Sequence, residues 1–390
     1  MREPEQDVPA PGRRLALDQM RGLVMLIMTV DHASEWLNKG RFVTDASWFW
    51  KPGTPIPTDQ FLLRWITHLC APTFVFLAGV GMALSVRKRR ARGDTDAAID
   101  RQLLLRGLFI VALELLWMSP AMMQGKGILL QVLYAIGCSM MLMVPLRRVP
   151  PKALGYGALA YFALSELLVG LAIMASGGKQ PALPAALLLT AGMFPLQLGP
   201  LQRLIAAYPV LPWLAIMALG YASAGFFARD NRGGAIERKL LAAGCASLAL
   251  FGVVRGLNDY GNMLLLRDSA APMQWLHVSK YPPSLTFLAL ELGIMALCLA
   301  ALYRMERAQL PVPIARALSA MAVLGQAALF FYVLHIHLIG LGAYLLGVIE
   351  AGGVGAALIG AAVCVAVLAL PVARYQRYKL ANPNGFTRYL

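Results

Sequence analysis

The sequence predicts an all-α fold: a polytopic transmembrane helical bundle of about ten spans with both termini in the cytoplasm. Three observations predict it. Hydrophobic residues make up 58% of the 390 residues and charged residues only 14%, whereas soluble domains carry roughly a quarter charged residues. Apolar windows of spanning length recur along the chain. Basic residues collect in every second loop between these windows.

Each window is about twenty residues long, the length at which a helix crosses the hydrocarbon core. The windows lie near 15–36, 61–86, 102–120, 127–146, 152–174, 208–228, 238–256, 284–303, 318–346 and 354–373. We divide the chain into a disordered cytoplasmic tail at 1–13, a single transmembrane domain at 14–380 and a second cytoplasmic tail at 381–390.

The formal charge of +15 comes chiefly from the short loops. Lys and Arg mark cytoplasmic loops, so the basic loops predict the cytoplasmic side, and the long loops at 37–60, 175–207 and 257–283 are expected outside. No aromatic and basic platform for single strands is present, and nucleic acid is excluded as a partner. We expect an integral, multi-pass protein of the bacterial plasma (inner) membrane, whose first window is a true span and not a cleavable signal peptide.

Residues 182–198, ALPAALLLTAGMFPLQL, are apolar enough for an eleventh span. One more crossing there would place every later basic loop outside. The segment is therefore interpreted as a re-entrant or interfacial helix that neighbouring protein shields from lipid.

The first window, LALDQMRGLVMLIMTVDHASEW, carries a stripe of ionisable residues. At 100° per residue, Arg21 and His32 differ by only about 20° around the helix axis, while Asp18 lies about 60° and Glu35 about 40° to one side. Ionisable groups at lipid depth must face protein or water. The stripe therefore predicts a bundle interior or cavity. For Asp18 and Arg21, an ion pair that only stabilises the helix remains the alternative.

Other polar groups are expected at the same depth. Arg64 and His68 lie one turn apart in the second window, where Pro72 predicts a kink. Tyr332, His335 and His337 lie near the outer end of the ninth window, and only one of the two histidines can point inward. Glu114, Glu166 and Glu291 are further cavity candidates, although a hydrogen-bonded structural role fits each equally well. Arg255, Asn258, Asp259 and Tyr260 belong either to an outer acceptor site or to a solvated loop.

These residue types support acyl-transfer chemistry. A neutral His32 can take a proton from a hydroxyl or amine, or can itself attack a thioester. Asp31 or Glu35 can orient its imidazole, and Arg64 beside His68 can stabilise an oxyanion. A three-histidine metal site is the competing interpretation. It is disfavoured because the histidines lie on separate helices, and the five cysteines form no metal motif.

The segment LDQMRG…VDH resembles the opening helix of acyltransferase-3-type membrane acyltransferases, which carry an arginine and, eleven residues later, a histidine. The later segments RWITHLCAPTFVFLAGVGMALS, ILLQVLYAIG and FFYVLHIHL resemble the heparan-alpha-glucosaminide N-acetyltransferase-like superfamily. The likeness is strongest over 14–145. The lysosomal enzyme of that superfamily has its active histidine in the first lumenal loop. The corresponding loop here, around Asp45, contains no histidine, so an acetyl-histidine intermediate does not carry over.

The resemblance implies transfer of an acyl group, such as acetyl, from a cytoplasmic acyl-CoA-type donor to an extracytoplasmic carbohydrate or other envelope hydroxyl or amine. Acyl-CoA is then a co-substrate, with no tightly bound cofactor. We expect His32, Asp31, His68 and Arg64 to be catalytic. Substrate or donor binding is expected of Asp18, Arg21, Glu35, Glu114, Tyr332 and His335, and no metal is expected.

Two other function classes remain open at this stage. A transporter or flippase can use the same polar stripe as a substrate or proton path, although no clear internal repeat supports it. A non-catalytic membrane partner should tolerate loss of the stripe. The lipid bilayer is a partner in every case. The acceptor, the acyl length and the oligomeric state, a homo-oligomer included, stay open.

Overall fold

The computed structural model describes residues 15–228, 234–382 and 385. The expected tail at 1–13 lies outside the described residues, as does most of the expected tail at 381–390. The first half of the chain forms α1 (Leu15–Leu37), α2 (Thr58–Thr67), α3 (Cys70–Ala91), α4 (Asp96–Leu113), the π-helical turn η1 (Glu114–Met118), α5 (Ser119–Met122), β1 (Gly127–Leu130), α6 (Val132–Leu146), α7 (Pro151–Ala175), α8 (Leu183–Ala185) and a second π-helical turn, η2 (Ala186–Thr190). The second half forms β2 (Gly192–Leu198), β3 (Leu201–Ala206), α9 (Val210–Phe227), α10 (Ala235–Leu257), α11 (Pro272–Leu276), α12 (Leu285–Met305), α13 (Val312–Gln326), α14 (Ala328–Leu345) and α15 (Val354–Ala381).

The predicted helical membrane bundle is confirmed. Eight helical segments of the described chain are long and apolar enough to cross a membrane: 58–91, 96–122, α7, α9, α10, α12, α14 and α15. The apolar stretches of α7 and α10 are only 22% buried inside the protein, so their outward faces suit lipid and not water. The two remaining expected spans correspond to α1, which carries four charged residues, and to the shorter α6; their crossing stays a prediction.

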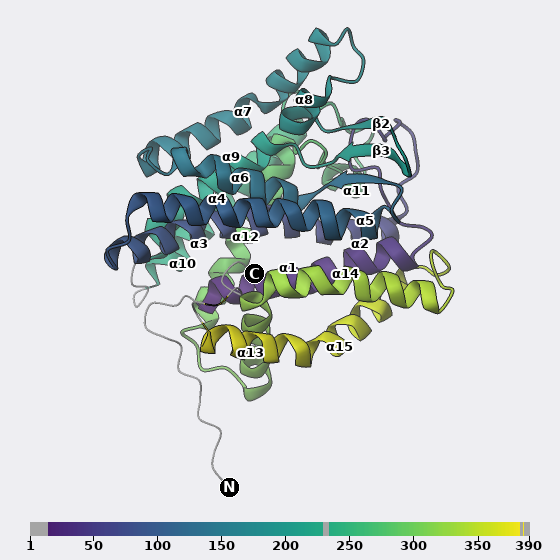
Figure 1. The fold of residues 1–390 in the computed structure, drawn as a ribbon. Helices are drawn as coiled ribbons and strands as arrows, with labels where there is room; N and C mark the ends of the chain where they lie inside the picture. The colour runs from purple at the N-terminus through teal and green to yellow at the C-terminus, as the bar shows by residue number, and fades with distance from the viewer. Residues whose placement is uncertain (1–14, 229–233, 383–384, 386–390) are drawn as a thin grey trace.

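The loops gather at two opposite ends of the bundle. At one end, Arg147 pairs with Asp96 and Asp100, and Arg307 pairs with Glu237. We call this the basic end. We call the opposite end the far end. There β1 pairs with β3, and Asn38, which follows α1, forms a bridge with Gly352, which precedes α15. In Figure 1 the sheet and α11 lie at the right of the view. The assignment of the basic end to the cytoplasm and of the far end to the outside stays a prediction.

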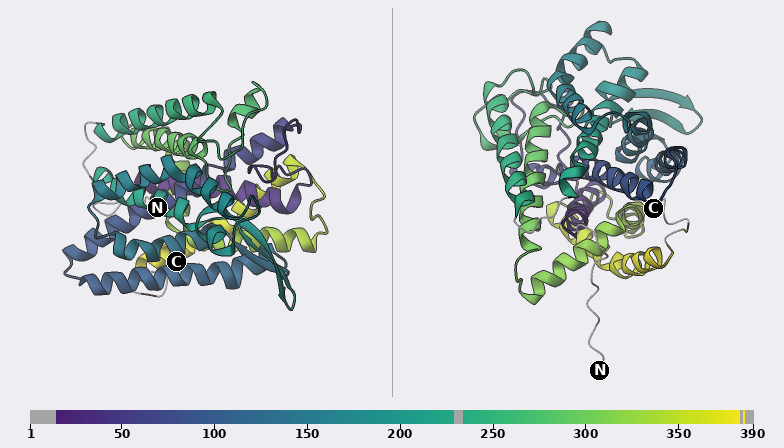
Figure 2. Two further views of the ribbon diagram at one scale, coloured as in Figure 1. Left: turned by 90° about the horizontal axis from the view of Figure 1, so that it is seen from above. Right: turned by 90° about the vertical axis from the view of Figure 1, so that its left-hand side faces the viewer.

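Residues 182–198 correct the prediction of a re-entrant or interfacial helix. Helical structure covers only 183–190, and Gly192–Leu198 forms β2. β2 pairs antiparallel with β3, which pairs in parallel with β1 to give the strand order β1–β3–β2. The sheet lies at one edge of the far end (Figures 1 and 2). The backbone N–H and C=O groups of β2 find hydrogen-bond partners in β3. The prediction of a helix was wrong because the apolar composition of a short segment does not distinguish a strand from a helix.

Two window boundaries are also corrected. The window at 127–146 begins with β1, so its helix starts only at Val132. The window at 318–346 contains a break at Ala327: α14 alone has spanning length, and α13 is a separate helix that packs on α1. The extended contact between α13 and α1 explains why an apolar sequence continues across the break.

The second span is broken between α2 and α3, at His68 and Leu69. Pro72 has no backbone N–H, so the carbonyl of His68 four residues earlier cannot receive the usual helical hydrogen bond. This confirms the predicted kink. About two turns further, Gly79 faces α9, and a Cβ there would lie 2.1 Å from the Met217 carbonyl oxygen. The close packing at Gly79 therefore brings α3 and α9 into contact and fixes the position of the kinked helix.

Candidate active site

A cavity of about 510 Å³ lies at the far end of the bundle. We call it the far-end cavity. Residues of α1, α2, β1 and α14 line it, together with the loop between α1 and α2 and the turn before α12. Its polar lining consists of Asp31, His32, Glu35, Arg41, Asp45, Arg64, Gln131, Gln180, Tyr208, Lys280, Tyr281 and Tyr332. The predicted chamber at the outer part of the polar stripe is therefore present.

His32 and His335 form a direct pair beside this cavity. His32 Nδ1 lies 2.6 Å from His335 Nε2, and both rings are buried. The ring centroids are 4.9 Å apart with an interplanar angle of 29°. A separation of this size with a short nitrogen–nitrogen distance means that the rings meet edge to edge. A hydrogen bond therefore links α1 to α14.

The hydrogen bonds of the pair determine which nitrogen carries each proton. His335 Nδ1 lies 3.1 Å from the Phe331 carbonyl oxygen, which can only accept. Neutral His335 therefore donates through Nδ1 and accepts through Nε2. His32 must then donate through Nδ1, which leaves the lone pair on its Nε2. No hydrogen bond occupies that nitrogen within the described residues, and His32 lines the cavity. The arrangement presents a basic nitrogen to the cavity.

Asp31 does not contact His32 through a hydrogen bond among the described residues, although the sequence suggested it as the orienting group. Both Asp31 oxygens accept from Arg64 Nη1 at 2.8 Å, and Arg41 lies 3.3 Å away. His335 occupies the orienting position instead. Asp31 precedes His32 by one residue and so points to a different side of α1.

Arg64 is the centre of an ion-pair chain in the wall of the far-end cavity. Its Nη2 donates to Asp45 Oδ2 at 2.8 Å and to the Tyr281 hydroxyl at 3.1 Å. Its Nε donates to the same Asp45 oxygen at 3.0 Å. The chain continues through Arg41 to Glu35 at 3.6 Å. With its three nitrogens engaged, Arg64 holds the loop around Asp45 against α1 and α2, and none of them is left for an oxyanion.

His68 belongs to this chain and does not line the cavity. Its Nε2 lies 3.0 Å from Asp45 Oδ2, and its Nδ1 is buried without a hydrogen bond. Burial by itself would raise the pKa of the Asp45 carboxyl, but the Arg64 charge and the His68 hydrogen bond hold it far below its usual range. The sequence predicts that His32, His68 and one of the pair His335 and His337 lie at the same depth. The structure joins His32 to His335 and places His68 on Asp45.

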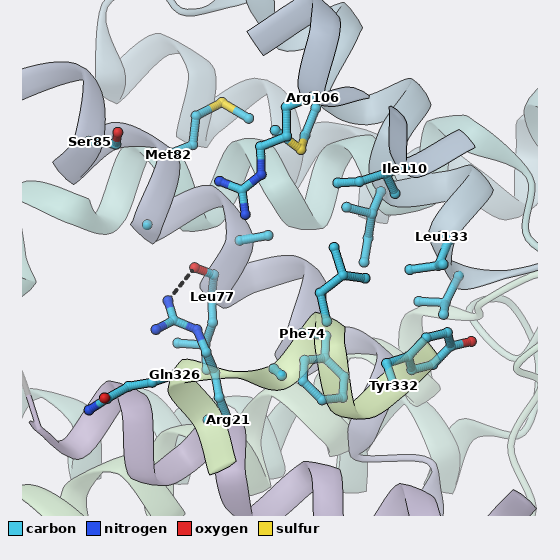
Figure 3. A pocket seen from close by; sticks show the side chains of 18 of the residues that line it. Arg21, Phe74, Leu77, Met82, Ser85, Arg106, Ile110, Leu133, Gln326 and Tyr332 are labelled. Carbon is cyan, nitrogen blue, oxygen red and sulfur yellow. Dashed lines mark hydrogen bonds between the residues drawn. The ribbon is translucent and has the colours of Figure 1, made fainter. Parts of the chain in front are cut away.

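A second cavity, of about 410 Å³, lies toward the basic end. We call it the basic-end cavity; Figure 3 shows it. Asp18, Arg21, Gln102, Arg106, Gln326 and Lys379 line it among apolar residues. Arg21 bonds Asp18 at 2.8 Å and the Leu77 carbonyl at 3.1 Å. Arg106 points its guanidinium toward the same space (Figure 3), and its buried Nε has no hydrogen-bond partner among the described residues. Three cations and one carboxylate make this cavity suited to an anion.

Phe74, Val132 and Tyr332 line both cavities. The two spaces therefore meet at these side chains, and the stripe of α1 passes from one to the other. Asp18 and Arg21 face the basic-end cavity, while His32 and Glu35 face the far-end cavity. Tyr332, expected at the substrate site, lies between them.

The remaining candidates have structural contacts. Glu114 Oε2 accepts the backbone N–H groups of Leu133 and Tyr134 and so caps α6. Glu166 binds the backbone of the loop before α12. Arg255 donates to four backbone carbonyls of the far-end loops. His337 stacks on Trp117 with ring centroids 4.6 Å apart. Glu291 is buried with one oxygen unpaired. None of these five residues lines either cavity.

Sequence reasoning missed Arg41, Lys280 and Arg106 as site residues. Arg41 and Lys280 lie in the long loops at 37–60 and 257–283 that are expected outside, and nothing local indicates that these loops fold back over the bundle. Arg106 carried a usable signal, since it lies inside an apolar window. The described residues also contain no group of three metal-ligating side chains.

The fold and the two cavities define a class: a multi-pass helical membrane protein with a polar chamber between its two ends. A family model for the heparan-alpha-glucosaminide N-acetyltransferase catalytic domain matches residues 13–254. The chain belongs to this family. Among curated proteins, none matches the chain. His335 and Lys280 lie beyond the matched residues, so their place at the site is known from the structure alone.

Proposed function

We propose that the protein is a membrane acyltransferase that moves an acyl group, such as acetyl, from a cytoplasmic thioester of the CoA type to a carbohydrate or other envelope hydroxyl or amine at the far end. Membership of an N-acetyltransferase family supports the transfer of an acyl group. The observation that carries the proposal is the meeting of the two cavities at Tyr332, directly beside His32.

The basic-end cavity fits the donor. Arg21, Arg106 and Lys379 offer positive charge for phosphate groups, and the apolar wall toward Phe74 suits the uncharged arm that carries the thioester. The positive-inside rule assigns the basic end to the cytoplasm, where acyl-CoA is present. The exposed loop cations Arg90 and Arg148 already pair with Asp96 and Asp100.

The far-end cavity fits the acceptor. Trp48, Phe49 and Tyr208 provide ring faces for a sugar, and Gln131 and Gln180 provide hydrogen-bonding groups. His32 Nε2 takes the proton of the attacking hydroxyl or amine, and His335 holds the imidazole in the required tautomer. General-base assistance of this kind contributes about 10²–10⁴-fold.

A sided assay tests the proposal. Purified protein in liposomes receives labelled acetyl-CoA on the basic side, with glucosamine as the probe acceptor enclosed on the other. The proposal expects labelled N-acetylglucosamine inside the liposomes and an equal amount of free thiol outside.

Transport is the alternative, because two adjacent cavities that share lining residues and carry polar groups also describe a substrate path. It predicts movement of unmodified glucosamine or of intact acetyl-CoA, with no thiol release. That outcome would reject the acyltransferase in favour of the transporter.

A further inference from the structure

Lys280 is held in a tight turn at the far end. Its backbone N–H donates to the Asp45 carbonyl at 2.8 Å, and Ser284 N–H closes the turn on the Ser279 carbonyl at 2.9 Å. Lys280 also forms an isolated bridge with Pro283. These bonds fix the direction in which the lysine side chain leaves the backbone, so its position in the cavity is set before any ligand enters.

The Lys280 side chain lies in the far-end cavity without an ionic partner. The residue is only 3% exposed and lines the same cavity as His32. Its ammonium lies 5.4 Å from the centroid of the Tyr281 ring, but it makes no hydrogen bond or ion pair within the described part of the chain. A buried charge without such partners is costly, so its retention indicates a ligand.

The carboxylates of the cavity do not supply that partner. Asp31 and Asp45 bond Arg64, and Glu35 lies against Arg41. Lys280 lines the same cavity as His32, whose Nε2 carries the free lone pair. Arg64, which the sequence suggested for stabilising an oxyanion, has its three nitrogens bound to Asp31, Asp45 and Tyr281.

Resting on the proposed function, we propose that Lys280 is a catalytic residue whose ammonium binds the carbonyl oxygen of the acyl thioester and stabilises the oxyanion that forms there. The acceptor oxygen or nitrogen forms a bond to the carbonyl carbon, and its proton passes to His32 Nε2. The carbonyl π pair moves to the oxygen beside Lys280. When that pair returns, the carbon–sulfur bond breaks, and the thiolate leaves with the bonding pair and receives the proton from His32.

The test compares Lys280→Met and Lys280→Arg with the wild type in acetyl transfer from acetyl-CoA to glucosamine. Removal of one oxyanion-stabilising donor lowers kcat by about 10²–10³-fold. We expect this loss for Lys280→Met, with the KM for acetyl-CoA changed less than threefold, and partial rescue by Lys280→Arg. A second measurement is thermal unfolding in detergent. Because Met removes an unpaired buried charge, the Tm of Lys280→Met should be equal to or above that of the wild type.

The outcomes separate this proposal from the proposed function. Undiminished transfer by Lys280→Met, with wild-type transfer intact, overturns the role of Lys280 and leaves the acyltransferase standing. A Tm well below that of the wild type in both variants overturns it in favour of a structural lysine. Absence of transfer by the wild-type protein overturns both the function and this role.

Discussion

His32 and His335, separated by 303 residues in the chain, lie with Nδ1 and Nε2 2.6 Å apart. The bond joins the first helix to α14, outside the segment that matches the family model. His335 Nδ1 donates to the Phe331 carbonyl, which can only accept, so His335 Nε2 must accept from His32 Nδ1. His32 is therefore the tautomer with its proton on Nδ1 and its lone pair on Nε2. In the proposed function this pair supplies the base, since the first outer loop contains no histidine.

Loss of the orienting imidazole should reduce the rate without removing the base. We expect His335→Phe to lower kcat by about 10–100-fold, because His32 is then no longer held in one tautomer. The KM for acetyl-CoA should change little, since His335 does not line the basic-end cavity. Steady-state kinetics measure the effect. His337→Phe, on the same helix but stacked on Trp117, is the matched control and should retain wild-type kcat.

The chain of ion pairs at Arg64 should dominate the stability of the far end. Arg64→Met leaves Asp31 and Asp45 buried without their main cation. Breaking a buried pair in this way costs about 3–5 kcal/mol. Thermal unfolding in detergent should show a large drop in Tm. Arg148→Met, which removes a half-exposed partner of Asp100, should change the Tm little. Equal shifts in the two variants would contradict a central role for Arg64.

Asp45 should make the thermal stability of the protein depend on pH in the acidic range. Its folded-state pKa lies far below its usual range, while an unfolded Asp titrates near about 3.9. A carboxyl whose pKa is lowered by folding contributes its full stabilisation above its pKa in the unfolded state. That contribution is lost as the pH falls toward its pKa in the folded state. The wild-type Tm should therefore fall below about pH 4, and Asp45→Asn should show a lower Tm at pH 7 with a flatter acid dependence. A parallel dependence in both proteins would contradict this assignment.

The basic-end cavity should determine donor affinity. Arg106→Gln removes a buried cation whose Nε has no partner among the described residues, so we expect the KM for acetyl-CoA to rise about tenfold or more. kcat should change less, because the proposed donor would present its carbonyl toward His32 and away from Arg106. Arg90→Gln, at the same end but outside the cavity, is the control. An unchanged KM for Arg106→Gln would place the donor elsewhere.

Much of the fold could be predicted from composition and spacing, because lipid demands long apolar helices and the loops sort by charge. The stripe of α1 was also predictable, since 3.6-residue periodicity places Arg21 and His32 on one face. The strand β2 was not, because its partner β3 satisfies the backbone from outside the segment. The break at Ala327 was equally hidden, since both helices beside it are apolar.

The site was predictable only in part. Arg21, His32, Arg64 and His335 could be named as polar residues at lipid depth, but their pairing depends on how α1, α2 and α14 pack. This packing explains why Asp31 forms an ion pair with Arg64 and does not hydrogen-bond the neighbouring His32. Lys280 reaches the cavity through a backbone bond to Asp45, a contact between two outer loops that carries no local sequence signal.

The most direct test of the account is a single-turnover measurement of thiol release from acetyl-CoA with glucosamine present, comparing wild type, His32→Ala and His337→Ala. We predict that His32→Ala lowers the rate by about 10²–10⁴-fold while acetyl-CoA still binds, and that His337→Ala matches the wild type. Thiol release at the wild-type rate in His32→Ala would contradict the central claim that His32 is the base at the meeting point of the two cavities.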